Sequence, residues 1–158
     1  MSPFSAAPEP AAPKPAAPPS GSALAGGDAE TPRLAAVYGE QEAAIRARWL
    51  ESLRVLRKAG PLALWGAGAK GVTFANLADP EAELIDCVVD LNPNKQSGFL
   101  PGTGHAVVSP DELGRRHIRH AVLMNPNYRQ ENQALLDRMG LDIRLVDLSE
   151  LEGGAAGA

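Results

Sequence analysis

The stretch PLALWGAGAKG at residues 61–71 decides the fold of this chain. Its first five residues form an apolar run that is too short for a helix, which predicts a buried strand. The glycines that follow, Gly66, Gly68 and Gly71, have the spacing G-x-G-x-x-G. A helix is expected next, over residues 70–77. A strand, a glycine-rich turn and a helix in this order are typical of α/β domains that bind a nucleotide.

Each glycine of this turn has a distinct expected role. Gly66 permits a tight turn, Gly68 lets a ligand approach the backbone, and Gly71 allows the helix to pack closely on the sheet. Free amides at the start of the helix favour an anion, and Lys70 in the same turn is a further candidate binding residue. Alternatively, the glycines serve only the geometry of the turn.

The rest of the chain alternates between expected strands and helices. Further strands are expected at residues 85–90, 107–108, 120–124 and 143–146, and helices at residues 109–116 and 128–139. This alternation produces a parallel sheet covered by helices on both faces. The sequence therefore predicts an α/β, Rossmann-like, three-layer domain, in which ligands collect beyond the carboxyl ends of the strands.

A long amphipathic helix is expected before this domain, over residues 34–58. Its apolar stripe is expected to pack on the domain and contains Ile45, Trp49, Leu53 and Leu56. The residues before the helix are rich in Ala and Pro and cannot bury enough apolar surface to fold. The expected organisation is a disordered tail at residues 1–33, one folded domain at residues 34–150 and a flexible C-terminus at residues 151–158.

The composition excludes several classes of function. Lys and Arg number 15 against 19 Asp and Glu, and the net charge of −4 disfavours binding to nucleic acid. Cys87 is the single cysteine, so neither an internal disulfide nor a zinc site is expected. No apolar run approaches the ~20 residues that span a bilayer. We expect a cytoplasmic, metal-free protein that binds neither nucleic acid nor a membrane.

Asp90 is the strongest indication of a nucleoside. It ends the second expected strand, 19 residues after Gly71. In dinucleotide-binding folds, an acidic residue at about 20 residues from the glycine motif contacts a ribose hydroxyl. Alternatively, Asp90 caps the turn at residues 92–94, because Asp and Asn both favour such local hydrogen bonds.

The loop at residues 90–105 is long for a compact domain, and such loops are frequently functional. Its candidate binding residues are Asn92, Asn94, Lys95 and His105. Lys95 can meet a phosphate as a point charge, and His105 can donate to a sugar or phosphate oxygen. An isolated histidine in a glycine-rich loop is alternatively structural.

Asn125, Asn127 and Tyr128 follow a later strand and repeat the Asn-Pro-Asn pattern of the earlier loop. The pattern initiates a turn, and this structural role alone could explain it. Because the carboxyl ends of parallel strands meet at one edge, these residues are expected close to the glycine turn and to Asp90.

Four motifs in this order carry a resemblance to a known family. They are residues 64–71, 89–96, 100–105 and 124–128. Together they closely resemble the C-terminal domain of sugar C-methyltransferases, which modify deoxysugars attached to a thymidine nucleotide. The resemblance covers residues 34–148, nearly the whole part of the chain that is expected to fold.

The resemblance implies a family of three-part enzymes with a zinc-binding domain, a domain that binds S-adenosylmethionine, and a Rossmann-like domain that faces the nucleotide-sugar. The sequence matches the third part, and it has neither a cysteine cluster for zinc nor a second glycine-rich strand-turn-helix unit. We therefore expect a module that binds a thymidine diphosphate deoxysugar at the residues named above. It is expected to hold no cofactor and no catalytic residue, and to contribute to methyl transfer only with a partner that binds S-adenosylmethionine.

Two other interpretations stay open. The same glycine motif and Asp90 could bind NAD in a redox-type module. Alternatively, the domain is a structural remnant without a ligand, and its proline-rich tail joins it to an assembly.

Overall fold

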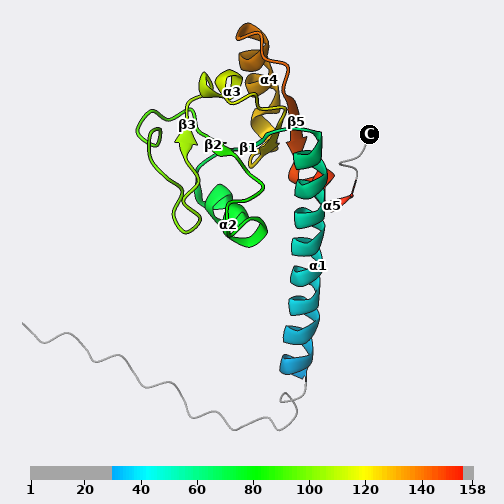
Figure 1. The fold of residues 1–158 in the computed structure, drawn as a ribbon. Helices are drawn as coiled ribbons and strands as arrows, with labels where there is room; N and C mark the ends of the chain where they lie inside the picture. Colours follow the sequence, from blue (N-terminus) through cyan, green and yellow to red (C-terminus); the bar gives the residue numbers. More distant parts are fainter. Residues whose placement is uncertain (1–29, 155–158) are drawn as a thin grey trace, which may run out of the picture.

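A computed structural model describes residues 30–154 of the chain (Figure 1). In chain order its elements are α1 (Glu30–Ala59), β1 (Leu62–Trp65), α2 (Ala69–Ala78), β2 (Cys87–Val89), β3 (Val107–Val108), α3 (Glu112–Arg115), β4 (His120–Leu123), the 3-10 helix η1 (Pro126–Tyr128), α4 (Arg129–Arg138), β5 (Arg144–Asp147) and α5 (Leu148–Glu152). Every predicted strand is present, with small differences at the ends.

The five strands form one parallel sheet in the order β3-β2-β1-β4-β5. β1 lies at the centre, where Leu64 is aligned with Val88 of β2 and with Val122 of β4. The chain thus builds outward from β1 to β3 and then crosses back to β4 on the other side of β1. The loops after β1 and β4 diverge at this point, which is where open α/β sheets bind their ligands.

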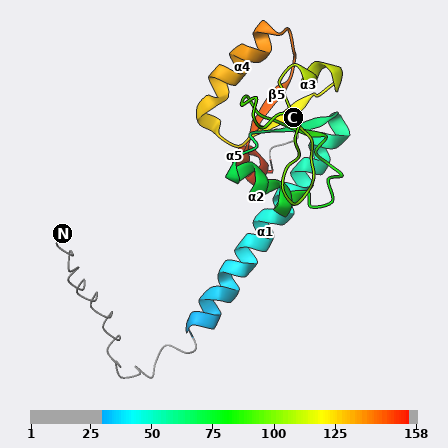
Figure 2. The same ribbon diagram turned by 90° about the vertical axis from the view of Figure 1, so that its left-hand side faces the viewer.

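The predicted three-layer α/β architecture is confirmed. Alternate strand residues face opposite sides of the sheet, as the two-residue period of a strand requires. One side packs against α1, α2 and α5 and includes Leu62, Leu64, Val88, Val122 and Val146. The other packs against α3 and α4 and includes Ala63, Trp65, Cys87, Ala121 and Leu145. Figure 2 shows α3 and α4 on the opposite side of the sheet from α2 and α5.

The C-terminal half of α1 packs on the domain, as its apolar stripe predicts. Leu53 and Leu56 are buried in the core. The ring of Trp49 lies 5.1 Å from the ring of Phe74 in α2, measured between centroids. Ile45, one turn earlier, is only half-buried and marks the end of the packed region.

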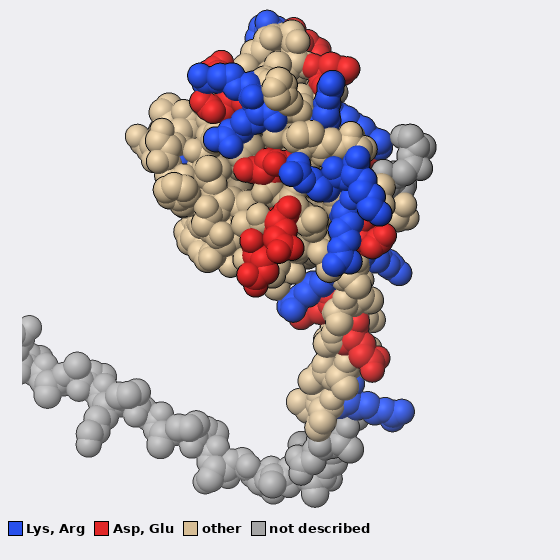
Figure 3. All heavy atoms as spheres, viewed as in Figure 1, with Lys and Arg blue, Asp and Glu red and all other residues tan. Residues whose placement is uncertain are grey.

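The N-terminal half of α1 is exposed over residues 31–44 and extends away from the sheet (Figures 1 and 2). The helix begins at Glu30, before the expected start at residue 34, and Pro32 fits its first turn because the first helical N–H groups need no helical partner. Figure 3 shows side chains of both charges along this helix. One such pair is Arg46 and Glu42, whose charged atoms lie 3.6 Å apart.

The C-terminal end of the described chain differs from the prediction. Residue 151 was expected to begin a flexible terminus, but Leu151 belongs to α5 and is fully buried. Asp147 and Glu150 form a capping box at the start of this helix. The buried hydroxyl of Ser52 in α1 donates to the carbonyl oxygen of Leu151 at 2.9 Å. The last helix is therefore fixed by contacts with α1, which lies far away in the sequence.

A smaller difference concerns the helix expected at residues 109–116. It is reduced to the single turn of α3, because residues 109–111 form a turn before it, in which the N–H of Glu112 donates to the carbonyl oxygen of Ser109 at 3.1 Å. The tail expected at residues 1–33 lies outside the described residues up to position 29, as do residues 155–158. Within residues 30–154, no helix is long and apolar enough to cross a membrane.

Candidate ligand-binding site

A cavity of about 540 Å³ opens at the carboxyl edge of the sheet, between the loops that follow β1, β2 and β4. It lies at the point where the strand order reverses. Eight of the residues predicted from the sequence line it: Gly66, Gly68, Lys70, Gly71, Asp90, Lys95, Asn125 and Tyr128. Its apolar wall includes Trp65, Leu91 and Met124. Such a mixture of apolar surface and a few polar groups is typical of small-molecule sites.

The glycine turn shows why two of its glycines are needed for the fold. Gly66 has a φ of +120°, which side chains rarely adopt, and its N–H donates to the carbonyl oxygen of Val89 at 2.8 Å. A Cβ atom on Gly71 would collide with the carbonyl oxygen of Gly66. Gly68 differs from both, because a Cβ atom there would meet nothing within 4 Å. Gly68 therefore leaves open space at the cavity rather than fitting a crowded turn.

The N-terminal end of α2 faces this cavity without a cap. Gly68 is the N-cap residue and offers no side-chain hydrogen bond, and the first turn contains no acidic residue. The N–H groups of a first helical turn carry partial positive charge and favour an anion. The ammonium of Lys70 is exposed and forms no ion pair with any residue in the described part of the chain. This end of the cavity is suited to a phosphate group.

Asp90 holds the loops on the β2 side of the cavity together. Its Oδ2 accepts a hydrogen bond from the N–H of Ala67 at 2.9 Å, and its Oδ1 accepts one from the N–H of Asn92 at 2.9 Å. The ammonium of Lys95 lies 3.5 Å from Oδ2. The alternative interpretation of Asp90 as a turn cap is thus confirmed, and the same carboxylate also fixes the glycine turn. Its contact with a ribose stays a prediction.

Four predicted binding residues do not line the cavity. Asn92 uses its side-chain oxygen to accept the N–H of Asn94 at 3.0 Å, and both residues belong to the exposed turn after β2. Asn127 donates its N–H to Oδ1 of Asn125 at 3.2 Å, which starts η1. The fourth residue is His105, which is buried elsewhere.

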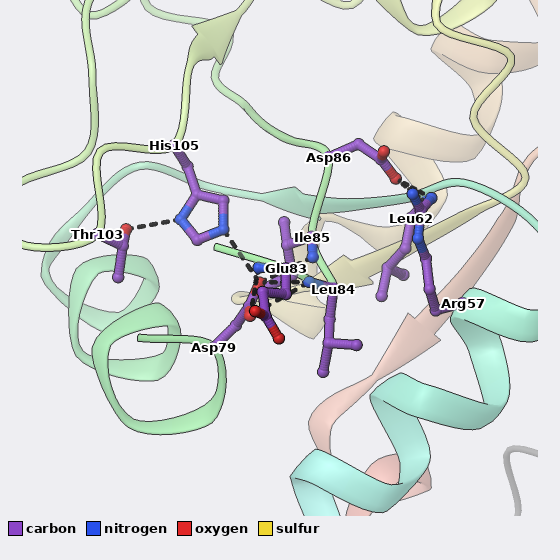
Figure 4. Close-up of polar contacts among 9 residues, drawn as sticks. All are labelled: Arg57, Leu62, Asp79, Glu83, Leu84, Ile85, Asp86, Thr103 and His105. Atoms are coloured by element: carbon purple, nitrogen blue, oxygen red, sulfur yellow. Dashed lines mark hydrogen bonds and ion pairs between the residues drawn. The ribbon is translucent and has the colours of Figure 1, made fainter. Parts of the chain in front are cut away.

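His105 belongs to a buried polar cluster at the C-terminal end of α2 (Figure 4). Its Nε2 lies 3.1 Å from Oδ2 of Asp79, and its Nδ1 lies 2.6 Å from the hydroxyl oxygen of Thr103. A carboxylate only accepts, so Nε2–H donates to Asp79, and Nδ1 shares a hydrogen bond with the Thr103 hydroxyl. Both ring nitrogens are therefore used within the protein, and the cluster ties the long loop to α2.

Asp79 is the centre of this cluster, which we call the Asp79 clasp: Asp79, His105, Thr103 and the three backbone N–H groups that Asp79 accepts. Those groups belong to Glu83, Leu84 and Ile85. Burial alone would raise the pKa of Asp79, but the hydrogen bonds from His105 and from the backbone lower it below the ordinary value of 3.8. The carboxylate is therefore charged and fully partnered at neutral pH.

Sequence reasoning missed two polar residues that line the cavity, Glu131 and Asn132 in α4. Both share a helix face with Tyr128, at spacings of three and four residues, and that spacing was the available signal. Asn132 is only 4% exposed, yet its side chain forms no hydrogen bond with any residue in the described range. Glu131 is exposed and forms no ion pair there either.

The described residues outline neither a metal site nor a reactive thiol. Within residues 30–154, no group of three or more His, Cys, Asp and Glu side chains could hold a metal ion. Cys87 is buried in β2, and burial raises the pKa of its thiol to about 11. The thiol is therefore protonated at neutral pH and packs as a core residue.

A known protein family matches the part of the sequence that forms the fold and the cavity. The sequence profile of the family described as C-methyltransferase C-terminal domain matches residues 28–140. A search of curated proteins found no match to the chain. The matched range covers well over half of the chain and contains every residue that lines the cavity. The chain therefore belongs to the family of C-methyltransferase C-terminal domains.

Proposed function

We propose that this chain binds a nucleotide-sugar, of the thymidine diphosphate deoxysugar class, in the cavity at the carboxyl edge of the sheet. The observation that carries the proposal is the placement of the uncapped N-terminus of α2 and the unpaired ammonium of Lys70 at one cavity. A helix N-terminus with a free cation favours a doubly charged group such as a diphosphate. Membership of the family supports a role in methyl transfer.

The cavity accommodates the three parts of such a ligand in a definite order. The diphosphate lies against Gly68 and Lys70, where the uncapped N-terminus of α2 and an unpaired ammonium meet. Its ribose lies on the β2 side, near Asp90 and Lys95, as the offset between the glycine motif and the acidic residue indicates. The sugar then occupies the β4 side, next to Asn125 and Tyr128. In this arrangement, the four predicted residues that do not line the cavity hold the loops in place and do not contact the ligand. They are Asn92, Asn94, Asn127 and His105.

Methyl transfer further requires a methyl donor, and the resemblance of this chain to sugar C-methyltransferases implies S-adenosylmethionine. The described residues contain one glycine-rich strand-turn-helix unit, and the proposal assigns that unit to the nucleotide-sugar. A partner domain would then bind S-adenosylmethionine and present its methyl group. Recovery of methylated sugar only when such a partner is added to the chain would support this division of roles, whereas methylation by the chain alone would contradict it.

Calorimetric titration of the full chain tests the binding proposal. Thymidine diphosphate and a thymidine diphosphate deoxysugar should both release or absorb heat and raise the melting temperature, because a ligand that binds only the folded state stabilises it. Lys70→Ala should weaken both ligands by about tenfold, the effect of losing one hydrogen bond to a charged group. Lys58→Ala, which removes an exposed lysine that does not line the cavity, is the matched control and should change the affinity for neither ligand. Absence of heat and of a thermal shift for both ligands would overturn the proposal.

NAD is the second candidate ligand, because the glycine motif and Asp90 also fit a dinucleotide. Titration of the chain into NADH, followed by the fluorescence of NADH, distinguishes the two candidate ligands. A nicotinamide site should change the emission of NADH, and a site for thymidine nucleotides should leave it unchanged. If no nucleotide of either kind affects the thermal stability of the chain, its glycines serve the fold alone.

A further inference from the structure

The wall of the cavity formed by α4 contains hydrogen-bonding groups that the protein itself does not use. Asn132 is nine-tenths buried or more, lines the cavity, and forms no hydrogen bond with any residue between positions 30 and 154. Its amide atoms are not among the side-chain atoms that are both sealed from solvent and unpartnered, so they are reached from the cavity, where water or a ligand satisfies them. The amide of Asn132 offers both a donor and an acceptor at this wall.

The opposite wall of the cavity is different, because its polar groups are already paired. Asp90 accepts two backbone N–H groups and lies 3.5 Å from the ammonium of Lys95. Of these two walls, the α4 wall therefore offers the side-chain hydrogen-bonding capacity that is free for a ligand.

The charges of the cavity also distinguish its two ends. Lys70 and the N-terminus of α2 attract an anion at one end. Glu131, which precedes Asn132, adds an unpaired carboxylate on the α4 side and disfavours an anion there. The part of the ligand that meets the α4 wall is therefore the part without phosphate.

We infer that Asn132 is a specificity-determining residue that reads a hydroxyl or carbonyl group of the sugar through its unpaired amide, with Glu131 accepting a neighbouring hydroxyl. The inference rests on the proposed function, since it assigns one wall of the same cavity to one part of the nucleotide-sugar. A site that hydrogen-bonds a substrate hydroxyl discriminates strongly against analogues that lack it, because its buried polar group is then left unpaired. Asn132 would thus select among sugars that share the same nucleotide.

The test compares two ligands on the full chain with Asn132→Leu, which keeps the side-chain volume and removes the amide. Binding of the thymidine diphosphate deoxysugar should weaken by about tenfold or more, the effect of leaving its polar group unpaired. Binding of thymidine diphosphate, which lacks the sugar, should stay unchanged. The matched control is Gln130→Leu, which removes an exposed amide of α4 that does not line the cavity and should affect neither ligand.

The melting temperature of the free protein provides a second readout. Asn132→Leu should raise it or leave it unchanged, because the substitution removes an unpaired polar group from a buried position. A purely structural role for the amide predicts a lower melting temperature. If Asn132→Leu does not fold, Asn132→Ala provides the test. Weaker binding of the deoxysugar nucleotide with unchanged binding of thymidine diphosphate supports the inference, and unchanged binding of both ligands overturns it.

The possible outcomes distinguish a failure of the proposed function from a failure of the inference about Asn132. Wild-type protein that binds neither ligand overturns the proposed function together with this inference. Wild-type protein that binds both ligands, with Asn132→Leu binding both equally well, overturns the inference alone. An equal loss of both ligands in Asn132→Leu also overturns it, because the amide would then contact the nucleoside diphosphate rather than the sugar.

Discussion

Two polar regions of this domain differ in how their hydrogen bonds are satisfied. In the Asp79 clasp, the carboxylate of Asp79 and both ring nitrogens of His105 have partners inside the protein. At the α4 wall of the cavity, the amide of Asn132 is as deeply buried as His105 but has no partner among the described residues. The two regions therefore differ in what they can offer a ligand, because only the α4 wall combines an unused amide with a position at the cavity.

The largest expected effect tests the structural side of this comparison. Asp79→Ala leaves three backbone N–H groups and the His105 ring without their acceptor in a buried region. We expect a loss of about 3–5 kcal/mol in the free energy of unfolding, as for other buried charged groups whose partner is removed. Denaturant unfolding followed by circular dichroism measures this loss.

Asp111→Ala is the control for that experiment. Asp111 is exposed and its side chain does not cap α3, so its removal should change stability by less than about 0.5 kcal/mol. Equal effects of the two substitutions would show that the clasp contributes no more than an ordinary surface carboxylate.

Within the glycine turn, Gly71 and Gly68 allow the same comparison between a residue that serves the fold and one that faces the ligand. Gly71→Ala places a Cβ atom against the carbonyl oxygen of Gly66 and should destabilise the fold by about 1–3 kcal/mol or more. Gly68→Ala meets no atom within 4 Å, so it should cost about 1 kcal/mol or less through the loss of a favourable N-cap. Thermal unfolding of the two variants checks the contrast.

Ligand binding by these variants completes the test. Gly68→Ala should fold and yet bind thymidine diphosphate more weakly than the wild type, because its methyl group occupies space at the cavity where the diphosphate is proposed to lie. If Gly68→Ala binds as well as the wild type, Gly68 is not at the anion site.

The strands could be predicted from the sequence because their signals are local. The apolar run before Gly66 and the spacing of the glycines identify β1, the turn and α2 without knowledge of any distant residue. The same holds for the packed stripe of α1, since the period of Trp49 and Leu53 is a property of the helix itself.

The parts that escaped prediction depend on contacts between distant segments. The burial of Leu151 follows from its position beside Ser52, which lies on α1. His105 is buried because Asp79, 26 residues earlier, accepts its ring N–H. Asn132 could not be distinguished from an exposed helical amide, because its burial depends on how α4 packs at the cavity.

The smallest expected effect concerns pH. The pKa of Asp79 in the folded protein lies below the ordinary value of 3.8, so the folded state favours the charged carboxylate more than the unfolded state does. Its stabilising contribution is therefore fully present above that value and is lost as the pH falls through the lower pKa of the folded state. Asp79→Asn should show a shallower loss of stability than the wild type when unfolding is measured from pH 5 downward.

The most direct test of the central claim is a titration of ¹⁵N-labelled protein with a thymidine diphosphate deoxysugar, followed by the backbone amide resonances. The account predicts that the resonances of residues 66–71, Asn125 and Asn132 shift with the ligand, whereas those of Asp79 and His105 in the clasp stay in place. Shifts confined to the clasp, or no shifts at saturating ligand, would contradict the assignment of the cavity as the nucleotide-sugar site.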